Sequence, residues 1–328
     1  MPSLPKGREE PSEGAMSDKG RSFDMGYYLV ALVDILGQKE KLLNLTELPT
    51  SSEEHDRFIN ILRDTYGAVE TCRNSFDTFF KAHLKEPSKD FPLPPQLQQQ
   101  FETLRATSVK IQQFADTVIV YVPLRTNAGQ IPLNGIYAAL LACSSTFVTM
   151  LAGGLACRGG IDIGLASEFH EGEIYGPALN SAYDLERHVA QYPRIVAGQC
   201  LVDYLDQHAR APGDDILARY TRALAMRCIE LFAHDVDGRP FLDVLGVGYE
   251  QAVTRAALED IIPEAHAFVV EQAQRAKEHK NVTKYTGCSA SDSISSGNST
   301  FSNRFFSLMS MGLLITRPNA PCSVCSQR

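Results

Sequence analysis

The chain alternates between two hydrophobic periods, which predicts a protein that mixes strands and helices. A continuous apolar run at residues 27–36 predicts a strand buried on both faces, and its single carboxylate is Asp34. Residues 108–122 hold two strand-like runs with Asp116 at the bend between them, which predicts a tight hairpin. Three more strands are expected from short apolar runs at residues 160–164, 193–196 and 241–245.

Apolar residues recurring every three to four positions predict the helices. A long helix is expected to begin near Ser51, and its apolar stripe consists of Phe58, Leu62, Tyr66, Val69, Phe76 and Phe80. A second helix follows Gly176, with Pro177 at a position where a missing N–H costs little. Other helices are expected from Gln38 onward and at residues 101–106, 214–233 and 249–279. This order of elements predicts an α/β domain with a mixed sheet flanked by helices.

Residues 126–157 contain no charged side chain and are long enough to cross a bilayer. Polar residues and a Gly-Gly pair interrupt the stretch, and no cluster of lysine or arginine flanks it. A helix that is apolar all round is also typical of the core of a large α/β domain. We therefore expect a buried helix and no membrane partner, with a membrane-associated protein as the alternative.

Composition narrows the class of protein further. The 328 residues carry a formal net charge of -8, which disfavours nucleic acid as the main partner. The eight cysteines show no disulfide-framework spacing, and no secretory signal precedes them, so a reducing cytoplasm is expected. Residues 1–24 are polar and predict a disordered leader, residues 25–285 predict the folded domain, and residues 286–328 predict an atypical, disordered tail.

Asp34 and Asp116 are the sharpest chemical feature of the sequence. Each is the one carboxylate in an apolar strand setting, where an unpaired carboxylate costs several kcal/mol. If the two strands are neighbours, the carboxylates form an oxygen-rich site suited to Mg²⁺ or Mn²⁺ and substrate phosphates. Alternatively, either aspartate caps a helix or pairs with Arg158 or Arg194.

Four segments in order resemble the catalytic domain of the class III nucleotidyl cyclases. They are Asp-Ile-Leu-Gly at 34–37, Phe-Ala-Asp-Thr-Val-Ile-Val at 114–120, Arg-Gly-Gly-Ile-Asp-Ile-Gly at 158–164 and Glu-Ile-Tyr-Gly-Pro-Ala-Leu-Asn-Ser-Ala at 173–182. The combination is most similar to the pyrimidine cyclases of bacterial antiphage (Pycsar) systems. The resemblance implies a ferredoxin-like mixed sheet and the synthesis of cyclic CMP or cyclic UMP and pyrophosphate from CTP or UTP.

The resemblance also implies roles for the residues around the two aspartates. Two divalent ions, Mn²⁺ or Mg²⁺, would be held by Asp34, the adjoining Ile35 and Asp116. The substrate phosphates would lie on the backbone that follows, at Gly37, Gln38 and Lys39.

In the family, the two halves of each site come from different subunits of a head-to-tail homodimer. Asn180 matches the asparagine that orients the ribose from the partner subunit. Four residues later the family places an arginine that stabilises the phosphate charge, and here Asp184 stands instead. Arg158 or Arg194 is expected to replace it, unless they form ion pairs with Asp162, Asp184 or Glu186.

Gln112 and Glu173 match the positions that select the base in the family. Glutamine donates and accepts hydrogen bonds, and ionised glutamate only accepts them, which suits the amine of cytosine better than a carbonyl of uracil. The resemblance therefore implies a pyrimidine cyclase whose product is a second messenger in antiphage defence and acts on a separate effector, in the cytoplasm expected above. The alternative is a degenerate cyclase-fold module that binds nucleotide, or only dimerises, without turnover.

Overall fold

The computed structural model describes residues 25–43, 45–85, 107–124, 133–170, 172–253 and 255–278. The expected leader at 1–24, the helix at 101–106 and the tail at 286–328 lie outside the described residues.

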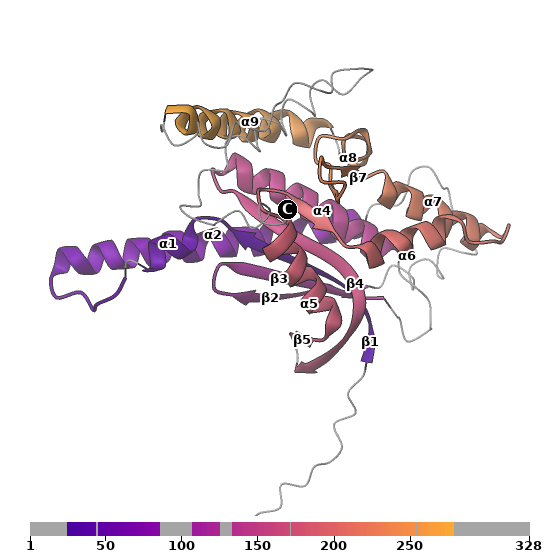
Figure 1. The fold of residues 1–328 in the computed structure, drawn as a ribbon, viewed down its shortest axis with the longest axis horizontal. Coiled ribbons are helices and arrows are strands. Elements are labelled where there is room, and N and C mark those ends of the chain that lie inside the picture. The colour runs from indigo at the N-terminus through magenta and orange to yellow at the C-terminus, as the bar shows by residue number, and fades with distance from the viewer. Residues whose placement is uncertain are drawn as a thin grey trace, which may run out of the picture.

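Within the described residues, an eight-stranded sheet forms the centre of the molecule (Figure 1). Its strands are β1 (Met25–Ile35), β2 (Lys110–Phe114), β3 (Thr117–Pro123), β4 (Cys157–His170), β5 (Glu173–Tyr175), β6 (Ile195–Ala197), β7 (Phe232–His234) and β8 (Pro240–Leu242). The strand order is β2-β3-β1-β4-β6-β8-β7, and β5 pairs with β4. The β4–β6 pair is parallel, whereas β1 is antiparallel to both β3 and β4. The predicted mixed sheet is therefore confirmed.

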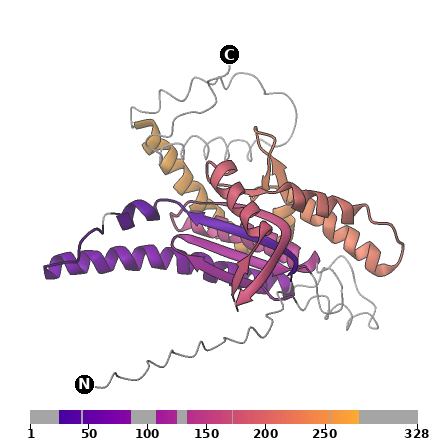
Figure 2. The same cartoon turned by 60° about the horizontal axis from the view of Figure 1, so that its bottom comes forward.

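Helices cover both faces of this sheet, which confirms the predicted α/β class. They are α1 (Gln38–Leu43), α2 (Ser52–Lys85), α4 (Leu133–Ala152), α5 (Pro177–Asp184), the π-helix η1 (Leu185–Val189), α6 (Gln199–Ala209), α7 (Ile216–Ile229), α8 (Val247–Ala252) and α9 (Arg255–Glu278). Helices α2 and α4 pack together on one face, and α5 packs on β1 and β4 from the other (Figures 1 and 2).

The alternation of side chains along β1 separates the two layers of the core. Leu29, Ala31, Val33 and Ile35 belong to the large apolar cluster with α2 and α4. Val30 and Leu32 belong to a small cluster with α5. Asp34 follows in the same alternation, so its side chain lies on the α5 face, where the helical cover is smaller.

Helix α4 lies between the sheet and the outer helices α7 and α9. Among the described residues it is the one helix long and apolar enough to cross a membrane, and 83% of its apolar window is buried inside the protein. The prediction of a buried core helix is confirmed.

Some predicted boundaries were wrong because tertiary contacts decide them. The helix expected to reach Ala233 ends at Ile229, and residues 232–234 pair with β8 instead. The helix expected over 249–279 is divided at Val253, which adopts an extended conformation. Strand β4 extends from Cys157 to His170, whereas the strand was expected only over 160–164, and the whole of α6 was missed.

Candidate functional site

The sheet register aligns Asp34 with two polar neighbours. Asp34 of β1 lies opposite Thr117 of β3 and opposite Arg158 of β4. Thr117 Oγ1 donates a hydrogen bond to Asp34 Oδ1 at 3.4 Å. Arg158 Nη2 lies 3.4 Å from Asp34 Oδ2, an ion pair between two mostly buried side chains. The three strands therefore present one polar row on the α5 face.

Asp116 is brought to this row by the turn between β2 and β3. Ala115 has a φ of 52°, a left-handed conformation that makes the turn tight enough to place Asp116 directly before β3. Ile35 N donates a hydrogen bond to Asp116 O at 3.0 Å, which fastens the turn to the end of β1. The strand and the hairpin are neighbours, which is the condition that a shared carboxylate site requires.

Burial and charge act together on Asp34. Burial raises the pKa of the Asp34 carboxyl, the negative charge of Asp116 raises it further, and Arg158 opposes both effects. The ionised form of Asp34 is thus under-compensated in this structure. A cation next to the two carboxylates would relieve this cost.

The oxygen donors near Asp34 and Asp116 fit a divalent ion that is coordinated only partly by the protein and partly by water or substrate. Within the described ranges there is no group of three or more His, Cys, Asp or Glu side chains arranged to hold a metal ion. Two carboxylates with neighbouring backbone oxygens suit Mg²⁺ or Mn²⁺, because these ions usually take their remaining ligands from water and substrate phosphates. The side chain of Ile35 is a hydrocarbon, so only its backbone carbonyl oxygen could contribute.

Glu186 belongs to the site, whereas the sequence predicted it only as an ion-pair partner for Arg158 or Arg194. Arg158 Nε lies 2.6 Å from Glu186 Oε1, and both side chains are mostly buried. Burial raises the pKa of Glu186; Arg158 lowers it and the charge of Asp34 raises it. Of the ion-pair partners expected for Arg158, the structure shows two, Asp34 and Glu186. The sequence does not place Glu186 close to Asp34, because that proximity depends on how α5 and η1 pack on β1 and β4.

The three residues expected to bind phosphate, which follow β1, differ in their exposure to solvent. Gly37 has a φ of 82°, a left-handed conformation that turns the chain into α1. Gln38 is only 1% exposed, and its Oε1 has no hydrogen-bond partner. Lys39 is exposed. The buried amide of Gln38 is therefore part of the wall behind the turn, and Gly37 and Lys39 are the accessible members.

A polar network links the strands that carry Gln112 and Glu173, the two positions expected to select the base. Figure 1 shows β4 bending strongly toward β5, and Glu168 near that end forms an ion pair with Lys110 of β2. Glu168 Oε1 also accepts hydrogen bonds from Tyr121 Oη at 3.3 Å and from Gly172 N at 3.0 Å. The network holds the β4–β5 hairpin across the α5 face.

Gln112 and Glu173 lie at either side of this network. Gln112 is half-buried on β2, two residues from Lys110, and Glu173 is exposed on β5 directly after Gly172. The charge of Glu173 contributes to raising the pKa of Tyr121, after the larger effects of burial and of Glu168. Both positions are therefore near Tyr121, on the face that also carries Asp34.

Asn180 and Asp184 lie on α5, and both are exposed. The Asp184 carboxylate lies 4.0 Å from His188 Nε2 on the same helical surface. Neither side chain belongs to the row formed by Asp34, Thr117 and Arg158.

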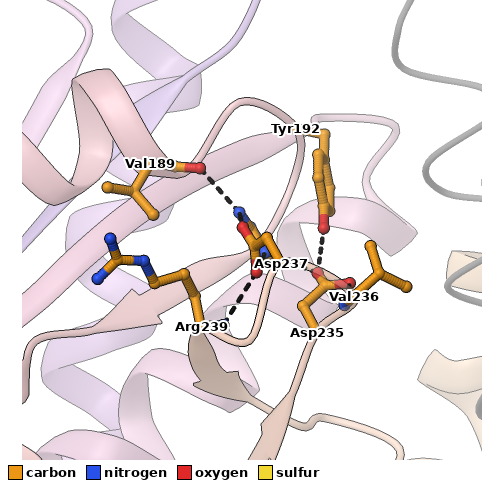
Figure 3. A network of polar contacts seen from close by, with 7 residues as sticks. Val189, Tyr192, Asp235, Val236, Asp237 and Arg239 are labelled. Atoms are coloured by element: carbon orange, nitrogen blue, oxygen red, sulfur yellow. Dashed lines mark hydrogen bonds and ion pairs between the residues drawn. The ribbon is translucent and has the colours of Figure 1, made fainter.

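Arg194 is held in a separate network, and Figure 3 labels its partners Val189, Asp235 and Asp237. Its Nη1 lies 2.7 Å from Asp235 Oδ2, and its Nη2 lies 2.7 Å from Asp237 Oδ2 and donates to Val189 O at 2.8 Å. The guanidinium also stacks over the ring of Tyr192, 4.3 Å from its centroid. The partners expected for Arg194 were Asp34 or Asp116, or else Asp162, Asp184 or Glu186, and the structure shows Asp235 and Asp237 instead. Arg194 thus joins the end of η1 to the turn between β7 and β8.

Replacing Arg194 by methionine is expected to lower the free energy of unfolding by about 2 kcal/mol, because two carboxylates and a carbonyl lose their partner. The cost stays below that of a fully buried pair because Asp237 is partly exposed. Urea unfolding measures the change. Arg210→Met, which removes an exposed ion pair with Asp206, is the matched control and should change little. Equal losses in the two variants would contradict the structural role of Arg194.

No known family model matches the sequence, and no curated protein matches it. Among solved structures, the chain is similar to the crystal structure of a class III adenylyl cyclase-like ATP-binding protein from Pseudomonas aeruginosa. The two are 14% identical with a TM-score of 0.34, and the match covers 78% of this chain and 44% of that chain. The chain thus spans less than half the length of that protein. A likeness at this level carries no functional conclusion, so function must be inferred from the residues themselves.

Proposed function

We propose that the protein is a metal-dependent nucleotidyl cyclase, which converts a nucleoside triphosphate into a 3′,5′-cyclic nucleotide and pyrophosphate. The observation that carries the proposal is the convergence of Asp34 and Asp116 at one end of the central strands, with Arg158 beside them. Paired carboxylates next to an arginine provide the charges that a triphosphate and its divalent ions require.

Each residue of the site has a role in this proposal. Asp34 and Asp116 hold Mn²⁺ or Mg²⁺, two ions per site. Bound there, such ions would lower the pKa of the ribose 3′-hydroxyl and neutralise charge on the leaving pyrophosphate. Gly37 and Lys39 face the phosphates. Arg158, which forms an ion pair with Asp34, takes the role of the family's arginine, whose position is occupied here by Asp184.

The substrate half of the site requires a second subunit. Asn180 is exposed on α5 and outside the row formed by Asp34, Thr117 and Arg158, so we propose that it orients the ribose bound by the partner of a homodimer. A monomer would then be inactive.

The base is proposed to be a pyrimidine, selected by Gln112 and Glu173 near Tyr121. Glu173 as an acceptor favours the exocyclic amine of cytosine. The cyclic CMP or cyclic UMP would act as a messenger for a separate effector in antiphage defence, within the cytoplasm.

A second candidate function is nucleotide binding or dimerisation without turnover. Two observations favour it: a carboxylate, Asp184, occupies the position of the expected arginine, and Arg158 is already engaged by Asp34 and Glu186. An arginine held by two carboxylates has less positive charge available for a phosphate.

The test is incubation of the purified protein with each of the four ribonucleoside triphosphates and Mn²⁺, followed by separation of the products. A cyclic pyrimidine nucleotide is expected, and it should be absent with Asp116→Ala. Asp77→Ala, which removes an exposed carboxylate on α2, is the matched control and should leave turnover unchanged. If a folded dimer consumes no triphosphate, the cyclase proposal fails, and binding without turnover replaces it.

A further inference from the structure

The Arg158 guanidinium is shared between two carboxylates that lie on different elements. Its Nη2 faces Asp34 of β1 at 3.4 Å, and its Nε faces Glu186 of η1 at 2.6 Å. The three side chains are 12%, 18% and 6% exposed, in the order Arg158, Asp34, Glu186. The short contact between Arg158 Nε and Glu186 Oε1 is poorly aligned for a hydrogen bond. The ion pairs join Arg158 to one oxygen of each carboxylate, so neither carboxylate holds the guanidinium by two parallel hydrogen bonds.

The fold is shaped at this point to bring Glu186 to Arg158. Helix α5 continues into the π-helix η1, a rare conformation that is frequent at functional sites. Gly160 lies two residues after Arg158 on the same face of β4, and it lets the helix rest directly on the strand. A Cβ at Gly160 would stand 2.3 Å from Ala182 O and 2.8 Å from Glu186 N. Glu186 therefore reaches Arg158 because a glycine and a widened helical turn coincide.

The charges around Arg158 do not balance. Asp34, Asp116 and Glu186 supply three negative charges when ionised and Arg158 supplies one positive charge, which leaves a net charge of -2. Arg187 also acts on Glu186, but it is exposed and donates a hydrogen bond to Tyr183 Oη. A divalent cation beside Asp34 and Asp116 would bring the cluster to neutrality, and it would then repel the guanidinium that now faces Asp34.

We propose that Glu186 is a positioning residue that takes over Arg158 when a divalent cation binds at Asp34 and Asp116. The inference rests on the metal site of the proposed function. Glu186 gives the guanidinium a second carboxylate partner. When the cation binds Asp34, Arg158 therefore keeps an ion pair and is not left as an unpaired buried charge. Without Glu186, Asp34 is the remaining carboxylate partner, and arginine and metal compete for it.

Binding of Mn²⁺ alone tests this inference, because free Mn²⁺ can be titrated by electron paramagnetic resonance without nucleotide or turnover. Glu186→Gln, which keeps the size of the side chain, is expected to raise the Kd for Mn²⁺ by about tenfold, equivalent to about 1.4 kcal/mol. Arg158→Met is expected to lower the Kd, since the competing cation is gone. The double variant should bind as Arg158→Met does, because Glu186 acts through Arg158.

Two results would overturn the inference. If a folded Glu186→Gln variant has an unchanged Kd for Mn²⁺, then Glu186 has only a structural role. An equal loss of affinity on removing Glu186 in both backgrounds would mean that its charge acts directly on the metal. Arg158→Gln replaces Arg158→Met if the latter does not fold, and Asp77→Asn is the control for the loss of one carboxylate.

The same titration separates this inference from the proposed function. If Asp116→Ala weakens Mn²⁺ binding and Glu186→Gln does not, the metal site stands and only the role of Glu186 is wrong. If the wild type binds no Mn²⁺, or if Asp116→Ala leaves the Kd unchanged, the metal site fails and the inference fails with it.

Discussion

Replacing Gly160 by alanine is expected to lower the free energy of unfolding by about 3 kcal/mol, at the upper end of the cost of overpacking. The added Cβ would stand 2.3 Å from Ala182 O, 2.5 Å from Leu185 Cβ and 2.8 Å from Glu186 N. Two of these atoms belong to the backbone and cannot move as a flexible side chain does. Relief therefore requires α5 and η1 to lift off β4, which exposes the small cluster beneath α5.

Urea unfolding measures the loss for Gly160→Ala, and Gly26→Ala is the matched control within the sheet. Gly26 lies in β1, where the nearest contact of an added Cβ is an ordinary 3.4 Å from Tyr28 Cε2. The control should be neutral or slightly stabilising, because alanine loses less conformational entropy than glycine on folding. Similar stabilities of the two variants would contradict the close approach of α5 to β4.

Asp162→Ala is expected to cost about 3 kcal/mol, because it leaves several buried donors without an acceptor. Asp162 is 3% exposed on β4. Its carboxylate accepts hydrogen bonds from Leu201 N at 2.8 Å, Ser181 Oγ at 2.6 Å and its neighbour Ile163 N at 2.9 Å. Leu201 lies in the first turn of α6, so Asp162 caps that helix from a strand and ties it to α5.

Asp215→Ala is the control for this capping role. Asp215 caps α7 by accepting from Ala218 N at 2.9 Å, and it is exposed. Its loss should cost about 1 kcal/mol, as for ordinary N-caps. Equal losses for Asp162→Ala and Asp215→Ala would show that burial of the Asp162 carboxylate adds nothing to the cap.

The sequence predicted best where local periodicity and burial coincide. Strand β1, the hairpin with Asp116 at its bend and the apolar helix α4 each extend over several residues of one clear period, and the structure contains all three. Elements of three residues, such as β5 and β7, exist because a neighbouring strand pairs with them, so their sequences carry little signal of their own.

The sequence also identified candidate site residues whose contacts in space it could not predict. Arg158 and Arg194 were equivalent as candidates for a charge beside the aspartates. The antiparallel register of β1 and β4 places Arg158 opposite Asp34, whereas the turn after β7 gives Arg194 two aspartates more than forty residues away in the chain. Register and loop position are tertiary properties, and they separate the two arginines.

By itself, the sequence determined the alternation of the central strands, the burial of α4 and the identity of the two isolated carboxylates, because these depend on which residue types stand at which spacing. The tertiary structure alone decided that Glu186 meets Arg158, that Asp162 caps α6 and that Gln38 is buried. Each of these depends on two segments approaching closely in space, and the free energy of that approach is set by packing across the sheet rather than by the residues of either segment.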